Sequence, residues 1–333
     1  MQTVKAPRLV DVAALAGVTI GTASKALSGS GALKHETRQR VLAAADRLNY
    51  RANSAARALT SGRSYTVGLL TSDSLGRFSI PVMLGAEDSL ATGQMAILFC
   101  DARADPVREQ HWLQTLVARN VDGIIVTSHR SDARPSISKL VPVPVVYAYS
   151  PSDDPEDTSV IPDDEHGGRL AGEHLTNVGR QRLVYVGGPT SFTASHLRLR
   201  GFQSAIDETD AELVTPPIFT DWEEDGGRQA ARILLQRGVT FDGVFCASDQ
   251  IARGFLDEVH ARGIRVPEDI ALVGFDNWEV MTGATRPRLT SIDMNLKRVG
   301  EVAATRLLDL IAGDSRPGEE FVPSELFIRE SSA

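Results

Sequence analysis

The pattern of apolar and polar positions predicts two short helices between residues 9 and 27, joined at Gly17. Glycine suits this junction because it adopts a left-handed backbone without steric cost. Thr19 can cap the second helix through its hydroxyl group. The apolar faces of the two helices consist of Val10, Val12, Ala13 and Ala16, and of Ala23, Ala26 and Leu27. Such a pair is typical of a DNA-reading helix-turn-helix, and an ordinary helical hairpin fits these residues equally well.

A third helix is predicted over about residues 36–48, where apolar positions again recur at helical spacing. These positions, which would close a small core over the first two helices, are Val41, Leu42, Ala45 and Leu48. Residues 51–59 have good helix propensity but fill only about two turns, and so short a helix is marginal in water. Residues 60–62, Thr-Ser-Gly, have the composition of a linker.

From Tyr65 onward, short apolar runs alternate with amphipathic segments. The expected strands are 66–71, 95–100, 123–127, 143–147, 182–186, 213–219, 243–246 and 270–274. The expected helices are 80–92, 106–119, 165–178, 198–208, 223–237 and 250–262. This alternation indicates parallel sheets that are covered on both faces. An acidic, Pro-rich break at residues 151–164 favours two α/β lobes, with a TIM barrel as the competing arrangement.

The net charge of −8 is unevenly distributed along the chain. Residues 1–64 contain ten Lys and Arg but three Asp and Glu, whereas the remainder contains 25 basic and 40 acidic residues. A basic head on an acidic body is expected when only the head approaches phosphates. The charge distribution therefore favours a DNA reader over a structural hairpin.

The sequence shows no signal peptide and no apolar run of bilayer length, and its two cysteines, Cys100 and Cys246, suggest no disulfide framework. A cytoplasmic protein without a membrane partner is expected. There is also no G-x-x-x-x-G-K-[ST] loop, no G-x-S-x-G elbow and no His/Cys cluster at metal-ligand spacing. Neither an enzymatic activity nor a cofactor is expected.

The N-terminal sixty residues resemble the LacI/GalR family of transcriptional regulators in the order and spacing of many positions. These positions are Asp11-Val12-Ala13, Ala16-Gly17-Val18, Thr22, Ser24, Thr37-Arg38, Val41, Leu48-Asn49-Tyr50, Asn53, Ala56-Arg57 and Leu59. Further landmarks of the family are Asp122-Gly123-Ile124-Ile125, 167–175, Gly187-Gly188-Pro189, 198–202, Ser248-Asp249 and 273–276. The resemblance therefore covers nearly the whole chain.

The resemblance implies an α/β fold with an N-terminal all-α helix-turn-helix head and a two-lobed periplasmic-binding-protein-like domain with parallel sheets. It also implies a repressor that binds a palindromic operator as a homodimer. A small-molecule effector in the cleft between the lobes would change the operator affinity. Most relatives respond to sugars, and some respond to nucleobases or nucleosides. A transport-type binding protein with a fortuitous helical head is the alternative, and the basic head argues against it.

The resulting domain division has three parts. Residues 1–50 form the DNA-binding domain, residues 51–63 the hinge helix and linker, and residues 64–333 the effector-binding and dimerisation domain. Within this last domain, lobe 1 is expected at about 64–161 and 291–320, and lobe 2 at about 162–290 and 321–333.

The exposed face of the expected recognition helix consists of Thr19, Ile20, Gly21, Thr22, Ser24 and Lys25. It contains no Arg, Asn or Gln, so bidentate base recognition is poor and phosphate contacts should supply more of the affinity. By resemblance, the hinge helix orders in the minor groove with Asn53, Arg57 and Leu59. Leu59 is expected to wedge between base pairs, and packing on the effector domain is the alternative for this residue. Relatives usually carry Ser or Thr helix caps where this chain has Arg8 and Lys34, so those two helices should start less firmly.

Ligands of two-lobed α/β proteins lie beyond the carboxyl ends of the strands. Sugars need carboxylates and Arg for their hydroxyl groups, and an aromatic face for their C–H surface. From these rules and the resemblance, the expected effector contacts are Phe78, Thr127, Arg198, Trp222, Ser248, Asp249 and Asp276. Structural alternatives are core packing for Trp222, an internal ion pair for Arg198, a strand-end cap for Asp276 and a cap of the helix at residue 250 for Asp249.

Overall fold

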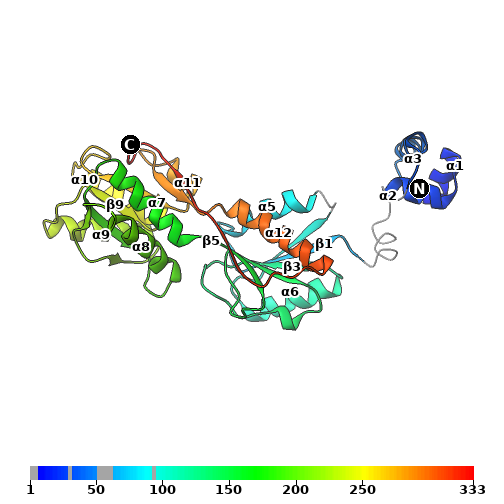
Figure 1. The fold of residues 1–333 in the computed structure, drawn as a ribbon, viewed down its shortest axis with the longest axis horizontal. Helices are drawn as coiled ribbons and strands as arrows, with labels where there is room; N and C mark the ends of the chain where they lie inside the picture. Colours follow the sequence, from blue (N-terminus) through cyan, green and yellow to red (C-terminus); the bar gives the residue numbers. More distant parts are fainter. Residues whose placement is uncertain (1–6, 29–31, 51–62, 92–94) are drawn as a thin grey trace, which may run out of the picture. The chain divides into compact units, whose positions relative to one another are not determined.

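The computed structural model describes residues 7–28, 32–50, 63–91 and 95–333. It divides into two compact units, residues 1–65 and residues 66–333 (Figure 1). The expected hinge residues Asn53, Arg57 and Leu59 lie outside the described residues.

In the described residues of the first unit there are three helices, α1 (Leu9–Ala16), α2 (Ile20–Ser28) and α3 (His35–Arg47). Gly17 ends α1 with the predicted left-handed backbone, at φ 64°. The Thr19 hydroxyl accepts a hydrogen bond from the Thr22 N–H at 3.2 Å, which confirms the predicted cap of α2. The small core consists of Val12, Ala13, Ala16, Ala23, Ala26, Val41, Ala44 and Ala45.

Two residues expected in this core lie at its edge instead. Val10 is 41% exposed and Leu42 is 38% exposed. Successive helical residues are turned by about 100°, so Val10 lies nearly opposite Val12 and Leu42 lies to the side of Val41. Neither Arg8 nor Lys34 caps its helix through a side-chain hydrogen bond. At α1 the Asp11 carboxylate accepts the Arg8 N–H at 2.7 Å instead.

The first lobe of the second unit contains a six-stranded sheet in the order β12-β5-β4-β3-β1-β2, and every strand pair in it is parallel. Its strands are β1 (Thr66–Thr71), β2 (Ala96–Asp101), β3 (Gly123–Val126), β4 (Val145–Ala148), β5 (Thr158–Pro162) and β12 (Gly318–Val322). Its helices are α5 (Ser79–Ala91), α6 (Pro106–Ala118) and α12 (Leu296–Ala312), with a short 3-10 turn η1 (Ser138–Leu140). The pair α5 and α12 covers one face of the sheet, and α6 covers the other (Figure 1).

The second lobe contains a sheet in the order β13-β11-β10-β9-β6-β7, with β8 also paired to β6. Its strands are β6 (Arg182–Gly187), β7 (Glu212–Leu213), β8 (Ile218–Phe219), β9 (Gly243–Cys246), β10 (Ala271–Phe275), β11 (Thr290–Asp293) and the antiparallel β13 (Glu325–Phe327). Its helices are α7 (Asp164–Asn177), α8 (Thr193–Ile206), α9 (Glu224–Gln236), α10 (Asp249–Ala261) and the short α11 (Glu279–Thr282). These two separate sheets confirm the two-lobed fold and exclude the TIM barrel.

Several expected boundaries are corrected by the strand pairing. The break at residues 151–164 contains β5, a buried strand of the first sheet. The expected strand 213–219 is two short strands because Pro216 and Pro217 interrupt it. The lobe boundary expected after residue 290 cuts β11, which lies wholly in the second sheet, and the one expected after residue 320 cuts β12.

Reciprocal glycines let α7 and α8 approach closely. A Cβ atom at Gly168 would lie 2.0 Å from the carbonyl oxygen of Arg198, and one at Gly201 would lie 1.8 Å from that of Glu165. Because only glycine permits this contact, the backbone of α8 is held firmly against α7. This packing positions Arg198 beside Asp164.

Among the described residues, no single helix has the length and apolar character needed to cross a membrane. Only α1 and α2 taken together meet that criterion, and the chain bends by 100° between them.

Candidate functional site

The predicted DNA-facing residues lie on the surface of the first unit. Thr19, Gly21, Ser24 and Lys25 are exposed, and Ile20 is 51% exposed. Thr22 is half-buried, and its hydroxyl lies 2.9 Å from that of Thr19. The capping contact therefore occupies part of the hydrogen-bonding capacity of these two threonines.

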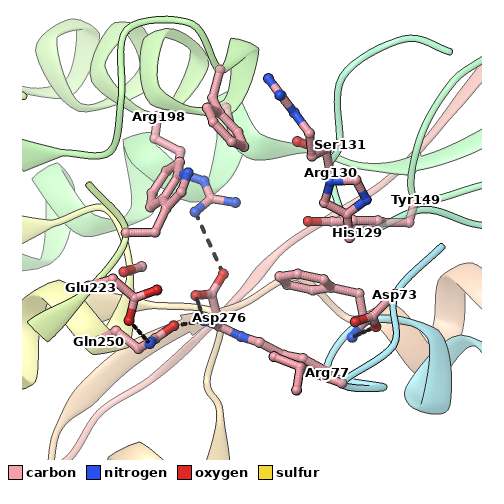
Figure 2. A pocket seen from close by; sticks show the side chains of 16 residues that line it. Asp73, Arg77, His129, Arg130, Ser131, Tyr149, Arg198, Glu223, Gln250 and Asp276 are labelled. Atoms are coloured by element: carbon pink, nitrogen blue, oxygen red, sulfur yellow. Dashed lines mark hydrogen bonds and ion pairs between the residues drawn. The ribbon is translucent and has the colours of Figure 1, made fainter. Parts of the chain in front are cut away.

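A cavity of about 260 Å³ lies between the two lobes of the second unit, at the carboxyl ends of their strands (Figure 2). The first lobe lines it with Asp73, Leu75, Arg77, Phe78, His129, Arg130, Ser131 and Tyr149. The second lobe lines it with Phe192, Ala194, Arg198, Trp222, Glu223, Ser248, Gln250 and Asp276. The cavity lies where the strand-end rule places a ligand.

Five of the seven predicted effector residues line this cavity, namely Phe78, Arg198, Trp222, Ser248 and Asp276. Thr127 does not, because this residue, which directly follows β3, is fully buried. Asp249 is also fully buried, and it accepts hydrogen bonds from the Ser291 hydroxyl at 2.6 Å and the Trp278 N–H at 2.7 Å. Burial raises the pKa of Asp249 well above its usual value. The cap of α10 is Ser248, whose hydroxyl accepts the Ile251 N–H at 3.2 Å.

Arg198 is the most deeply buried charge in the cavity wall, at 3% exposure. Its Nε donates to Asp164 at 2.8 Å, and its Nη1 donates to the Ala247 carbonyl at 2.6 Å. Its guanidinium carbon also lies 3.6 Å from the centre of the Phe275 ring. The internal ion pair weighed for Arg198 is therefore present, and the side chain borders the cavity as well.

Asp276 lies between two arginines from opposite lobes, as Figure 2 shows. Its Oδ1 lies 3.6 Å from Arg198 Nη1, and its Oδ2 accepts a hydrogen bond from Arg77, which also donates to Gln250. Burial raises the pKa of Asp276, and the two guanidinium groups partly offset that effect. We call the contact of Arg77 with Asp276 and Gln250 the inner bridge, since it joins the lobes inside the cleft.

A second connection joins the lobes beside the cavity, where Arg130 is one of the lining residues. Helix α8 has no cap from its own N-cap residue, Phe192. Instead Asp132 of the first lobe accepts the Thr193 N–H at 2.9 Å, and Arg130 stacks on the Phe192 ring at 3.8 Å. Burial acts to raise the pKa of Asp132, but the Thr193 N–H and Arg130 hold it below its usual value. We call these contacts the rim clasp.

Two aromatic pairs face the cavity, one from each lobe. Phe78 stacks on Tyr149 with ring centres 4.7 Å apart and planes 15° apart. Phe192 meets Trp222 edge to face at 5.5 Å. Burial raises the pKa of Tyr149, so its phenol stays protonated. Trp222 also packs against the core of its lobe, so both roles weighed for this residue are present.

Eleven of the sixteen lining residues are not among the seven expected effector contacts: Asp73, Leu75, Arg77, His129, Arg130, Ser131, Tyr149, Phe192, Ala194, Glu223 and Gln250. Four of them, His129, Arg130, Ser131 and Tyr149, lie one to five residues beyond the ends of β3 and β4, where the strand-end rule finds them if it is extended that far. Glu223 and Gln250 flank helix starts, which carry no signal that separates a cavity contact from a solvated residue. The described residues contain no group of three or more His, Cys, Asp or Glu side chains that could hold a metal ion.

Comparison with known proteins relates both units to regulators. Residues 8–53 match the family described as bacterial regulatory proteins, lacI family, and residues 173–332 match a periplasmic binding protein-like domain. The chain is 33% identical to the HTH-type transcriptional regulator CelR of Thermobifida fusca, over 99% of this chain and 100% of that protein.

Two solved structures show the same architecture. A transcriptional regulator CelR–cellobiose complex has a TM-score of 0.68 and 29% identity, with 98% of this chain and 100% of that chain covered. A lac repressor dimer bound to operator and the anti-inducer ONPF has a TM-score of 0.74 and 26% identity, with coverage of 98% and 99%.

A helix-turn-helix unit joined to a two-lobed unit with an interlobe cavity defines the class of ligand-responsive DNA-binding regulators. The chain belongs to the lacI family of bacterial regulatory proteins. It is a transcriptional regulator and not an enzyme, in agreement with the expectation from its sequence.

Proposed function

We propose that this protein is a repressor that binds a palindromic operator as a homodimer, and that a neutral sugar in the interlobe cavity changes its operator affinity. The proposal is supported by the cavity, which is lined by both lobes. The same chain also contains a helix-turn-helix. A ligand held by both lobes changes the angle between them, and a homodimer translates that change into the spacing of its two DNA heads. The cytoplasm is the proposed location, because the operator must be within reach.

The charges of the cavity wall favour a neutral ligand. Its three arginines are all paired with carboxylates of this chain: Arg77 with Asp276, Arg130 with Asp132 and Arg198 with Asp164. A phosphate or carboxylate on the ligand would compete with these pairs, whereas sugar hydroxyl groups can add to them. The aromatic pairs offer apolar surface for the C–H faces of a sugar ring. The cellobiose bound by the related CelR structure is a neutral sugar of this kind.

The DNA contacts are proposed from the exposed face of α2 and from the hinge. On α2, Ile20 would meet a thymine methyl group, and Ser24 and Lys25 would reach bases or phosphates. In the hinge, Asn53 and Arg57 would contact DNA, and Leu59 would be the minor-groove wedge. Lys25→Ala should weaken binding to all sequences and reduce the slope of log affinity against log salt by about 1. Fluorescence anisotropy over a salt series measures this slope, with Lys139→Ala in the second unit as the control.

A homodimer is supported by apolar residues on neighbouring elements of the first lobe. Ile80 and Leu84 on α5 are 45% and 47% exposed, and Phe99 on β2 is 43% exposed. Helix α5 contacts β2, so these residues belong to one region of the lobe. Exposed apolar surface of this kind suits contact with a second copy of the chain.

Selection of binding sites from a random DNA library tests the proposal. The full chain should enrich a palindrome whose half-sites lie about one helical turn apart. In parallel, a thermal-shift screen of neutral sugars, sugar phosphates and nucleobases should raise the melting temperature only with neutral sugars. Enrichment of no palindrome would contradict the operator, and a shift with nucleobases alone would contradict the ligand class.

A further inference from the structure

A second cavity of about 310 Å³ lies next to the first, on the other side of the inner bridge. Three residues line both cavities, namely Arg77, Phe78 and Asp276, so these side chains form the wall between them. The second cavity is lined further by Pro81, Asn277, Trp278, Glu279, Asp293, Met294, Asn295, Leu296 and Lys297. The cleft is therefore divided into two chambers by side chains and not by backbone.

The wall depends on a charge pair that can open. The Arg77 and Asp276 side chains are 14% and 6% exposed, so separating them without new partners would be costly. Asp276, however, keeps Arg198 at 3.6 Å when Arg77 leaves. The Arg77 guanidinium already lies 4.6 Å from the centre of the Trp278 ring and 5.1 Å from that of Phe78. Arg77 can thus move along an aromatic surface that retains a cation–π contact.

Arg77 also has unused hydrogen-bonding capacity. Its Nε is buried and has no hydrogen-bond partner among the described residues. A buried donor without an acceptor costs free energy, which a ligand hydroxyl group at this position would recover. The unpartnered donor lies at the wall, where a ligand that crosses from one chamber to the other must pass.

The second chamber has the chemistry of another sugar subsite. Trp278 provides an aromatic face, and Asn277, Asp293 and Asn295 provide polar groups. Asp276 and Asn277 hold left-handed backbones at φ 101° and 47°, which non-glycine residues rarely adopt and which concentrate at ligand sites. Each chamber alone lies near the lower end of the about 300–1,000 Å³ of ligand pockets, whereas the two joined fall well inside that range.

We infer that the effector is a neutral sugar of at least two rings, and that Arg77 is the gate that admits it to the second chamber. One ring occupies the first chamber, the second ring occupies the other, and Arg77 turns from Asp276 to the hydroxyl groups that pass between them. This inference rests on the proposed sugar-binding function of the cleft. It adds that Arg77 determines the chain length to which the protein responds.

Isothermal titration of the full chain with glucose and with two- and three-glucose sugars tests the inference. The two-ring sugars should bind at least about tenfold more tightly than glucose. Lys297→Trp fills the second chamber from its rim, where the Lys297 side chain is 58% exposed and paired with Asp88. This variant should weaken two-ring binding about tenfold and leave any glucose binding within threefold of wild type. Lys139→Trp is the matched control, because Lys139 is likewise an exposed lysine paired with one aspartate, Asp154, and lines neither cavity.

A second variant tests the gate directly. Arg77→Met keeps an unbranched side chain but removes the charge, so two-ring sugars should associate faster than with wild type. Stopped-flow tryptophan fluorescence measures this rate, since Trp278 lies beside Arg77. Equal affinities for glucose and two-ring sugars, unchanged by Lys297→Trp, would contradict the role of Arg77 as a gate. The proposed binding of a sugar in the cleft would not be affected. Failure of every sugar to bind would overturn the proposed ligand class and the gate together.

Discussion

The inner bridge and the rim clasp, which both connect the two lobes, differ in how deeply their side chains are buried and in which groups they join. The inner bridge joins side chains that are 14% and 6% exposed, inside the ligand cavity. The rim clasp joins Arg130 and Asp132, at 37% and 22% exposure, to the start of α8. A buried charge is costly once its partner is removed, whereas a partly exposed one can be hydrated. We therefore expect the inner bridge to control the fit of a ligand, and the rim clasp to adjust how readily the lobes close.

The largest effect is expected from breaking the inner bridge at Asp276. Asp276→Ala leaves the Arg77 guanidinium buried without its carboxylate, so the free energy of unfolding should fall by about 3–5 kcal/mol. Urea denaturation of the full chain measures this loss. Asp314→Ala is the control, because Asp314 pairs with Arg316 on the surface at 61% and 57% exposure and should leave the unfolding midpoint unchanged. A loss no larger than that of the control would contradict the role given to the inner bridge.

A smaller effect is expected at the rim clasp. Asp132→Ala removes the cap of α8 and should lower the free energy of unfolding by about 0.5–2 kcal/mol. Because the cap comes from the other lobe, the same variant should also weaken sugar binding in isothermal titration. Asp105→Ala is the matched control, since Asp105 caps α6 within one lobe through the Val107 N–H at 2.8 Å. Equal sugar affinities in the two variants would show that the clasp does not assist closure.

The smallest effect is expected at His174 in the second lobe. The pH range over which it changes stability distinguishes it from the rim clasp. Burial lowers the pKa of His174, whose Nε2 lies 2.7 Å from the Ser332 hydroxyl oxygen. The unfolded chain therefore binds a proton at His174 more readily than the folded chain does. As a result, the free energy of unfolding falls as the pH drops below about 6.5. The stability that Asp132 gains from its lowered pKa is instead complete above about 3.9 and is lost only as the pH falls through the folded value. His174→Gln should therefore abolish the loss between pH 7 and pH 5, and Asp132→Ala should preserve it.

The sequence predicts the elements well wherever one local signal dominates. Strand β1 begins and ends at the predicted residues 66 and 71, and Gly17 turns the helix-turn-helix as expected. Strand β5 was not predicted, because its few apolar residues are flanked by acidic residues and prolines. Its pairing with β4 and β12 identifies it as a strand. Helix α12 was not predicted at all, although its 17 residues cover three strands of the first sheet.

Prediction of the site depends on which element positions each residue. Phe78 directly precedes α5, Arg198 lies in the second turn of α8, and Asp276 directly follows β10. All three lie near the carboxyl edges of the sheets, so a positional rule finds them. Asp249 obeys the same rule, yet its side chain turns inward to hold Ser291 and the Trp278 backbone. The role of Arg77 could not be predicted, because its partners Gln250 and Asp276 lie 173 and 199 residues away and belong to the other lobe.

We propose that sugar binding in the interlobe cleft is coupled to operator binding by the helix-turn-helix unit. The most direct test is the operator affinity of the full chain, measured by fluorescence anisotropy with and without a saturating two-ring sugar. The sugar should change the operator Kd by about 5- to 150-fold, and operator should change the sugar Kd by the same factor. An operator Kd that stays the same while the sugar is shown to be bound would rule out this coupling.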